Sequence, residues 1–241
     1  MKPVPVLASV IDLAADQERS FLTLLTSEER MEEGSFQHWS ARDTLAHIAY
    51  WRQQMADKLH ALANPAVDTW KLGDDEQNAI VYKAYHHLSW EEVERLLAES
   101  HLNVKNALEQ ADPNDLQDPA LDPQHHGRQP WKSVISNSFT HPIVHLAAYL
   151  VDHGRKEQAL KMQEDATRTL LTLDDDPEWQ GIAVYNLACV QALLGDRDQA
   201  LANLREALNL APTLVPWSKE DPDLASLRPD PRFQALDEEV G

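Results

Sequence analysis

Three of the eleven histidines have a spacing that could bring imidazoles together. His141 and His145 are four residues apart in an apolar segment, so on a helix both side chains would project from one face, one turn apart. That is the spacing with which a helix offers two nitrogens to one metal ion. His47 lies at the edge of another apolar stripe. Because an unpaired buried imidazole costs about 1–3 kcal/mol, we expect the pair to be hydrogen-bonded, metal-bound or at the lip of a cavity.

Other reactive residue types give weaker signals. Cys189 is the single cysteine, which excludes an intrachain disulfide and a thiolate cluster, so any metal site must use histidines and carboxylates. We interpret Cys189 as a small packed residue rather than a nucleophile. The sequence has no Gly-rich phosphate loop and no Gly-x-Ser-x-Gly elbow, so it predicts no cofactor-binding residue, and it names no catalytic residue.

The composition favours helices. The chain has 241 residues, of which 43% are hydrophobic, 25% are charged and only 7 are glycine, so an all-β fold is not expected. The formal net charge of −19 argues against nucleic acid or an anionic membrane as a partner, because both bind Lys and Arg patches. No stretch reaches the roughly 20 apolar residues of a membrane span, and the first segment is no signal peptide. We therefore expect a cytoplasmic protein.

Hydrophobic periodicity predicts four long helices. Apolar residues recur at spacings of three and four, which places them on one stripe of each helix. Ser40 and Ser89 are predicted N-caps, supported by Asp43 and Glu92 three residues further on. The predicted helices run from Val6 to Leu25, from Ser40 to Ala63, from Ser89 to Asp112 and from Trp131 to Asp152.

The connections between these helices define the bundle. Residues 64–88 are too long for a simple hairpin loop, and the segment from Asp74 to His87 looks helical, so a crossover is expected between helices two and three. The proline-rich residues 112–130 read as an irregular loop. Within the fourth helix Pro142 removes a backbone donor, so a kink or a restart is expected there.

The C-terminal part has a different pattern. Residues 181–214 fit the 34-residue tetratricopeptide template, with Ala188, Ala200 and Ala207 where two helices must approach closely and Gly195 at the turn. We expect such a segment to extend the packing of the bundle, or to mediate self-association or protein binding, with a final short helix that caps the open end. The predicted domains are a bundle over 1–154 and a tetratricopeptide-like extension over 155–241.

The N-terminal part resembles a known family. The segment Trp39–Ile48, the crossover and the pair His141-x3-His145 are similar to the DinB/YfiT superfamily, and within it to the ClbS/DfsB-like branch, over about residues 5–155. Members of that superfamily are four-helix bundles with a left-handed crossover that commonly hold a divalent metal, nickel or zinc among others, on three histidines. The resemblance implies that His47, His141 and His145 are metal ligands.

This ligand set implies a class of chemistry. Three neutral imidazoles leave positions open for water or substrate, as in catalytic rather than structural zinc sites. The implied activity is metal-dependent hydrolysis or thiol transfer on a small electrophilic molecule. The alternative is a non-enzymatic interaction protein in which the tetratricopeptide-like segment binds a partner and the metal site is vestigial.

Some neighbouring residues can be assigned in two ways. Trp51 and Tyr149 either line a pocket at the histidines or are core aromatics at helical spacing. Metal-bound histidines usually donate their second N–H to a carboxylate or a carbonyl, and Glu18, Asp152 or a backbone oxygen could accept it.

Overall fold

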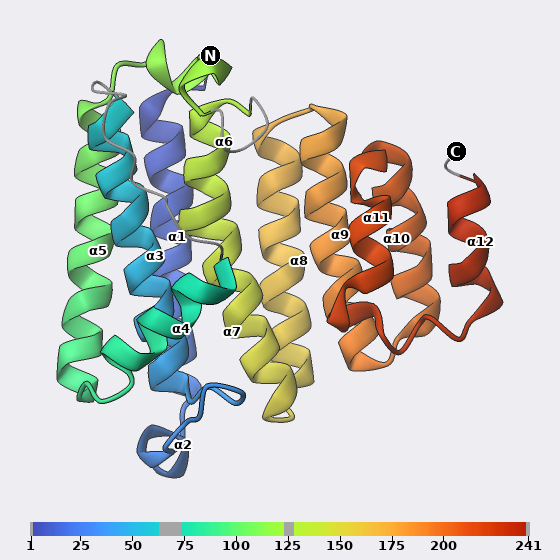
Figure 1. The fold of residues 1–241 in the computed structure, drawn as a ribbon, viewed down its shortest axis with the longest axis horizontal. Coiled ribbons are helices and arrows are strands. Elements are labelled where there is room, and N and C mark those ends of the chain that lie inside the picture. Colours follow the sequence, from blue (N-terminus) through green and yellow to red (C-terminus); the bar gives the residue numbers. More distant parts are fainter. Residues whose placement is uncertain (1, 63–73, 123–127, 240–241) are drawn as a thin grey trace. The chain divides into compact units, whose positions relative to one another are not determined.

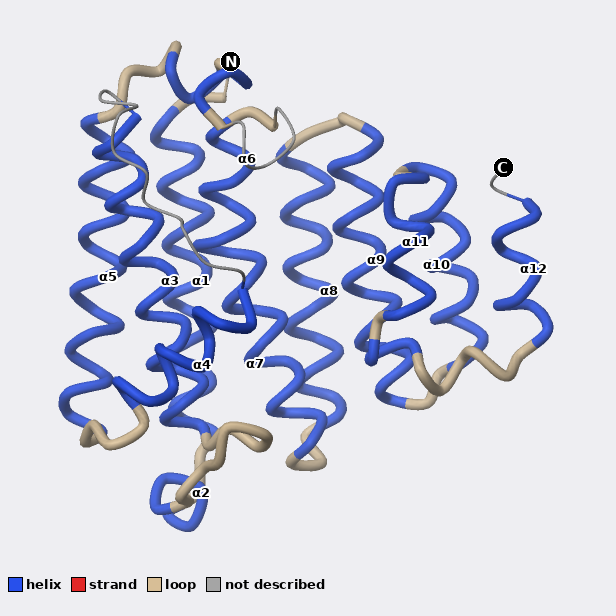
Figure 2. Tube along the Cα trace, in the orientation of Figure 1, coloured by secondary structure: helices blue, strands red, loops and turns tan. Residues whose placement is uncertain are grey.

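The computed structural model describes residues 2–62, 74–122 and 128–239, and the chain forms two compact units, Met1–Pro142 and Ile143–Gly241. Within the described ranges the regular structure is helical and no β-strand occurs (Figures 1 and 2). The predicted all-α class is confirmed. None of the described helices combines the length and apolar character that crossing a bilayer requires. The expected domain boundary after residue 154 stays a prediction.

The first unit is a helical bundle. Its elements are α1 (Val4–Leu24), α2 (Ser27–Met31), α3 (Ala41–Leu62), α4 (Asp74–Tyr85), α5 (Trp90–Gln110), α6 (Pro130–Ile135) and the turns η1 (Asp115–Gln117), η2 (Pro119–Leu121) and η4 (Ser136–Thr140). α5 packs on both α1 and α3, and the segment α6–η4 packs on α1. These long helices lie side by side in Figure 1. Four helical segments therefore enclose the core of this unit.

The predicted helix starts are confirmed by their capping bonds. The backbone N–H of Asp43 donates to Ser40 Oγ at 3.2 Å, and the Asp43 carboxylate accepts from the Ser40 N–H at 3.0 Å. Ser89 and Glu92 form the same reciprocal pair at the start of α5. Each cap satisfies backbone donors that the first helical turn leaves open. The predicted end of the second helix, at 63–65, lies outside the described residues.

The predicted crossover contains the short helix α4, which packs on α3. Trp51 on α3 donates its indole N–H to Asn78 Oδ1 on α4 at 3.1 Å. Tyr82, also on α4, donates its hydroxyl to the Gly34 carbonyl at 3.0 Å. These polar contacts fix α4 against α3 and against the segment that precedes it.

The fourth helical segment is not one continuous α-helix. After α6 the chain makes a π-helical turn, η4, in which the N–H of His141 bonds to the carbonyl of Ser136, and α7 (His141–Asp152) follows. Pro142 explains the break, because it has no N–H to give to the carbonyl four residues earlier and its ring crowds that position. The expected kink or restart at Pro142 thus takes the form of a wider turn just before it. The predicted end at Asp152 is also found, and Gly154 just beyond it takes a left-handed conformation with φ of 74°.

The second unit is built around α8 (Lys156–Leu173), α9 (Pro177–Leu194) and α10 (Arg197–Leu210), which pack on one another in sequence order. Besides these helices and α7 it contains α11 (Val215–Glu220), α12 (Pro231–Glu239) and the short turns η5 (Pro212–Leu214) and η6 (Pro222–Leu224). α9 packs on both α8 and α10, and α12 packs on α10. The final helix thus contacts the last hairpin, and its role as a cap of a repeat stays a prediction.

The hairpin of α9 and α10 depends on small residues. Ala188, Ala200 and Ala207 are all fully buried in its core. A Cβ on Gly181 would come within 2.6 Å of the Ala211 Cβ, so glycine is needed for the close approach at this end. Gly195 makes the turn with φ of 84°. The structure thus has two helices joined at Gly195, and their assignment to a tetratricopeptide-like repeat stays a prediction.

Candidate metal centre

Two of the predicted ligands meet inside the first unit. His47, in the first half of α3, is only 3% exposed, and His141 is the first residue of α7. Their Nε2 atoms are 3.0 Å apart. Two nitrogens bound to one ion at about 2.05 Å would be separated by roughly 2.9 Å at a right angle and 3.3 Å at a tetrahedral angle. The observed pair therefore has a spacing suited to a shared metal ion as well as to a hydrogen bond.

The third predicted ligand follows on the same helix. His145 is one turn after His141 in α7, and one nitrogen from each of the three histidines lies within 4.8 Å of the others. Because α7 is continuous, its own backbone fixes the spacing of the two imidazoles. Desolvation lowers the pKa of His145 to about 4, so this side chain is neutral at neutral pH and keeps a lone pair for a metal ion.

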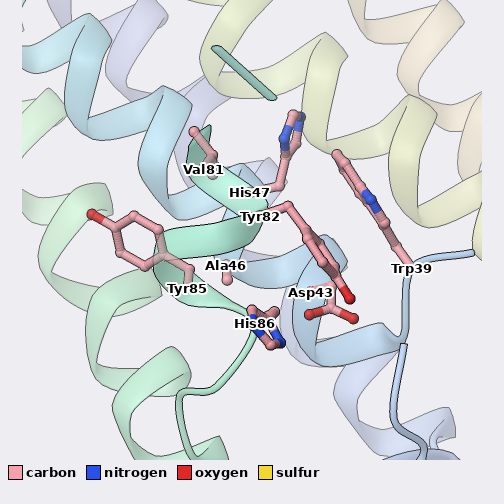
Figure 3. Close-up of a pocket in the computed structure, with 8 residues that line it drawn as sticks. All are labelled: Trp39, Asp43, Ala46, His47, Val81, Tyr82, Tyr85 and His86. Atoms are coloured by element: carbon pink, nitrogen blue, oxygen red, sulfur yellow. The ribbon is translucent and has the colours of Figure 1, made fainter. Parts of the chain in front are cut away.

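A small pocket opens beside His47, between α3 and α4. Figure 3 shows the side chains that line it. Trp39, just before the start of α3, is nearest on one side, with its ring centroid 4.6 Å from that of His47. Tyr82 and His86 stack on each other at 5.0 Å. The remaining lining residues are Asp43, Ala46, Val81 and Tyr85.

Asp43 is the carboxylate in this pocket, one turn before His47 on α3. Its Oδ2 accepts from the N–H and the hydroxyl of Ser40, whereas its Oδ1 is buried and bonds to no partner in the described structure. A Cβ on Gly34 would come within 2.0 Å of Oδ2, so only glycine allows this packing. The Asp43 side chain is thus held in place through Oδ2, and its Oδ1 can accept a further hydrogen bond.

The Tyr82 hydroxyl is already engaged in this wall. It donates to the Gly34 carbonyl, and burial together with the negative charge of Asp43 raises its pKa. A raised pKa keeps the phenol neutral at any ordinary pH. Tyr82 therefore serves as a neutral wall of the pocket.

The two predicted pocket aromatics have structural partners. Trp51 is 6% exposed, bonds to Asn78 and has its ring 6.1 Å from His47. Tyr149 is 5% exposed and stacks on His153 at 3.8 Å. Neither is among the residues that line the pocket at His47. Their role at a binding site stays a prediction.

Glu18, one of the acceptors expected for a histidine N–H, has a different partner. Glu18 pairs with the guanidinium of Arg52, which is completely buried in the bundle. Asp152 at the end of α7 is exposed. The carboxylate that lines the pocket together with His47 is Asp43, whose spacing from Ser40 had indicated only a helix cap.

Trp39, Tyr82 and His86 were not predicted as site residues. Trp39 precedes the N-cap Ser40, so its position next to His47 depends on the path of the chain before α3. Tyr82 and His86 reach the site only because α4 folds back onto α3. An aromatic residue directly before the cap of a histidine-bearing helix was the one local signal available.

Comparison with known proteins agrees with this architecture. A family model described as the DinB superfamily matches residues 12–153, which is more than half of the chain and includes all three histidines. No curated protein and no solved structure gives a significant match. The chain therefore belongs to the DinB superfamily.

Proposed function

We propose that this protein binds a divalent metal ion through His47, His141 and His145 and acts on a small electrophilic molecule as a hydrolase or a thiol transferase. The observation that carries the proposal is the gathering of three imidazole nitrogens from two helices within 4.8 Å. An all-imidazole donor set suits zinc and nickel, which we propose as the physiological metals.

The surrounding residues support binding of a small substrate. A bound divalent ion would supply Lewis-acid chemistry at positions that three protein ligands leave open. Trp39 and Val81 give the pocket apolar walls, and the buried His47 also lines it. Asp43 offers the free carboxylate oxygen that could hold an imidazole N–H or accept a proton from a substrate. No catalytic residue is assigned beyond these groups.

The C-terminal hairpin has a proposed role of its own. We interpret α9 and α10 as a tetratricopeptide-like repeat that extends helix packing or binds a protein. The buried small residues Ala188, Ala200 and Ala207 and the turn at Gly195 support this assignment. The alternative function, an interaction protein with a vestigial metal site, rests on the same hairpin. The cytoplasmic location stays a prediction.

Metal analysis distinguishes the two functions. The full-length protein is equilibrated with Zn²⁺ or Ni²⁺, freed of excess ion and analysed by plasma mass spectrometry. We expect about one ion per chain in the wild type and a loss of at least tenfold in occupancy in His47→Ala and His141→Ala. The matched control is His60→Ala, since His60 is on the same helix as His47 but exposed to solvent.

Two results would overturn the metal site. One is a wild-type protein that retains no ion, and the other is a folded His141→Ala variant, checked by circular dichroism, that retains as much as His60→Ala. Co²⁺ gives an independent readout, because its visible absorption bands report nitrogen ligation directly. Metal loading without turnover of thiol or ester substrates would favour the interaction protein.

A further inference from the structure

A second cavity, of about 300 Å³, lies entirely within the unit Ile143–Gly241. Its walls come from α7, α9, α11 and the turn η6. Apolar side chains, including Val144, Ala148 and Leu193, form one part of the lining. Asp221 and Asp223 form another part. A cavity of this size accommodates a small organic molecule rather than a bare ion alone.

Neutral donors hold the first of these carboxylates in place. Asp221 is 6% exposed, and its Oδ2 accepts from the Tyr185 hydroxyl at 2.8 Å and from the Cys189 thiol at 3.7 Å. Its Oδ1 accepts from the backbone N–H of Asp223 at 3.0 Å. Burial raises the pKa of the Cys189 thiol, so this group donates as a neutral S–H. None of these partners brings a positive charge to Asp221.

Among the described residues, the second carboxylate has no side-chain partner. In the described part of the chain, Asp223 engages in neither an ion pair nor a hydrogen bond through its carboxylate. Burial and the negative charges of Asp221 and Asp152 raise its pKa to about 6. Two carboxylates therefore lie close together in the cavity lining.

Compensating cations are missing from the described lining. No lysine or arginine is among the described residues that line the cavity. The guanidinium of Arg228 bonds to the backbone carbonyl of Asp221 rather than to its carboxylate. Because buried carboxylates are normally paired, these two carboxylates are placed to attract a cation.

We propose that this cavity binds a small organic cation, a primary ammonium that carries a short hydrocarbon body. The ammonium would donate to Asp221 and Asp223, and the hydrocarbon would contact Val144, Ala148 and Leu193. Trp217 on α11 also lines the cavity and is 53% exposed, so its ring is placed at the mouth, where it can stack on the ligand or attract its charge. This proposal does not depend on the metal centre.

Binding is tested with a matched pair of probes on the full-length protein. 2-Phenylethylammonium and 2-phenylethanol have nearly the same shape and differ in charge. We expect calorimetry to show binding of the ammonium and at least tenfold weaker binding of the alcohol. Asp223→Asn should weaken ammonium binding at least tenfold, whereas Glu220→Gln, which removes an exposed negative charge nearby, should leave it unchanged.

Two further variants locate the binding site. Ala148→Phe fills the apolar part of the cavity without changing its charge and should also abolish binding. It tests the same site with both carboxylates in place, so the result does not depend on the folding of Asp223→Asn. His141→Ala tests whether the amine binds instead to a metal ion at the histidines. Such binding would be lost in this variant, whereas ammonium binding in the cavity should be unchanged. Loss of binding in His141→Ala would overturn the proposal.

The remaining outcomes also decide the question. Equal affinity for the ammonium and the alcohol, or no binding of either, would overturn the proposal. So would tight Zn²⁺ binding that Asp223→Asn removes while the ammonium does not bind. In that case Cys189, Asp221 and Asp223, whose ligand atoms lie within 4.8 Å of one another, form a metal site instead.

Discussion

Buried carboxylates have different kinds of partner in the two units. In the first unit the carboxylate of Glu18 meets the guanidinium of Arg52, and the buried Asp122 accepts from Lys58 at 2.7 Å. In the second unit Asp221 is buried just as deeply but is held by a phenol and a thiol. A buried carboxylate with a cationic partner has its charge compensated within the chain, whereas carboxylates held by neutral donors remain able to attract a cation. The contrast separates structural charge from charge available for binding.

The largest expected effect concerns the paired charges. Glu18→Gln leaves the Arg52 guanidinium buried without a carboxylate, and we expect a loss of about 3–5 kcal/mol in the free energy of unfolding, measured in urea. Asp16→Asn is the matched control, because Asp16 on the same helix pairs with Arg19 at the surface. That exposed pair should contribute less than about 1 kcal/mol. Equal losses in both variants would show that the buried pair contributes no more than the exposed one.

Metal binding should stabilise the first unit through its histidines. At an ion concentration of about one hundred times Kd, linkage predicts a gain of about 2.7 kcal/mol in the free energy of unfolding. Thermal unfolding with Zn²⁺ should show this gain in the wild type and in His60→Ala, and chelation should reverse it. A similar gain in His141→Ala would show that the ion binds elsewhere.

The carboxylates of the second unit should give a pH-dependent stability. The pKa of Asp223 is about 6 in the folded protein and near 3.8 when unfolded, so the folded state holds the proton more tightly. Its contribution to stability is present below pH 4 and is lost as the pH rises through 6. Solvent screening reduces the unscreened value of about 3 kcal/mol to on the order of 1 kcal/mol.

Unfolding curves at pH 4 and pH 7 measure this contribution. The decrease in stability between these pH values should be smaller in Asp223→Asn than in the wild type, and Glu220→Gln should follow the wild type. An unchanged decrease in Asp223→Asn would mean that other groups cause it.

The smallest expected effects are at helix caps. Ser89 and Glu92 exchange two capping bonds in the first unit, whereas Asp196 in the second accepts one long bond of 3.4 Å from Gln199. Ser89→Ala should cost about 1 kcal/mol, and Asp196→Ala about half as much. Chemical denaturation of both variants measures the difference, and a larger loss in Asp196→Ala would contradict the bonding pattern.

Local signals predicted most of the fold. Helical periodicity located the long helices, and the caps at Ser40 and Ser89 lie where the side-chain spacing indicated. The spacing of His141 and His145 is also local, because four residues on one helix define one face. The agreement of these features with the structure follows from interactions within a few residues of each other.

The features that were missed depend on distant segments. The pairing of Glu18 with Arg52 joins residues 34 positions apart, and Asp221 meets Tyr185 across 36 positions. Nothing in the sequence around Asp221 distinguishes it from other acids in a proline-rich segment. The pocket beside His47 could likewise not be predicted, because part of its lining comes from side chains of α4, which is distant in the sequence.

The π-helical turn η4 has a consequence for the direction of the histidines. Each residue of an α-helix advances the chain by about 100° around the axis, so one additional residue within a turn changes the angular phase of everything that follows. The side chains of α7 are therefore offset around the helix axis from the positions that a continuation of α6 would give them. Deleting Asn137 would restore a single phase and rotate both imidazoles of α7 by about 100°, away from His47.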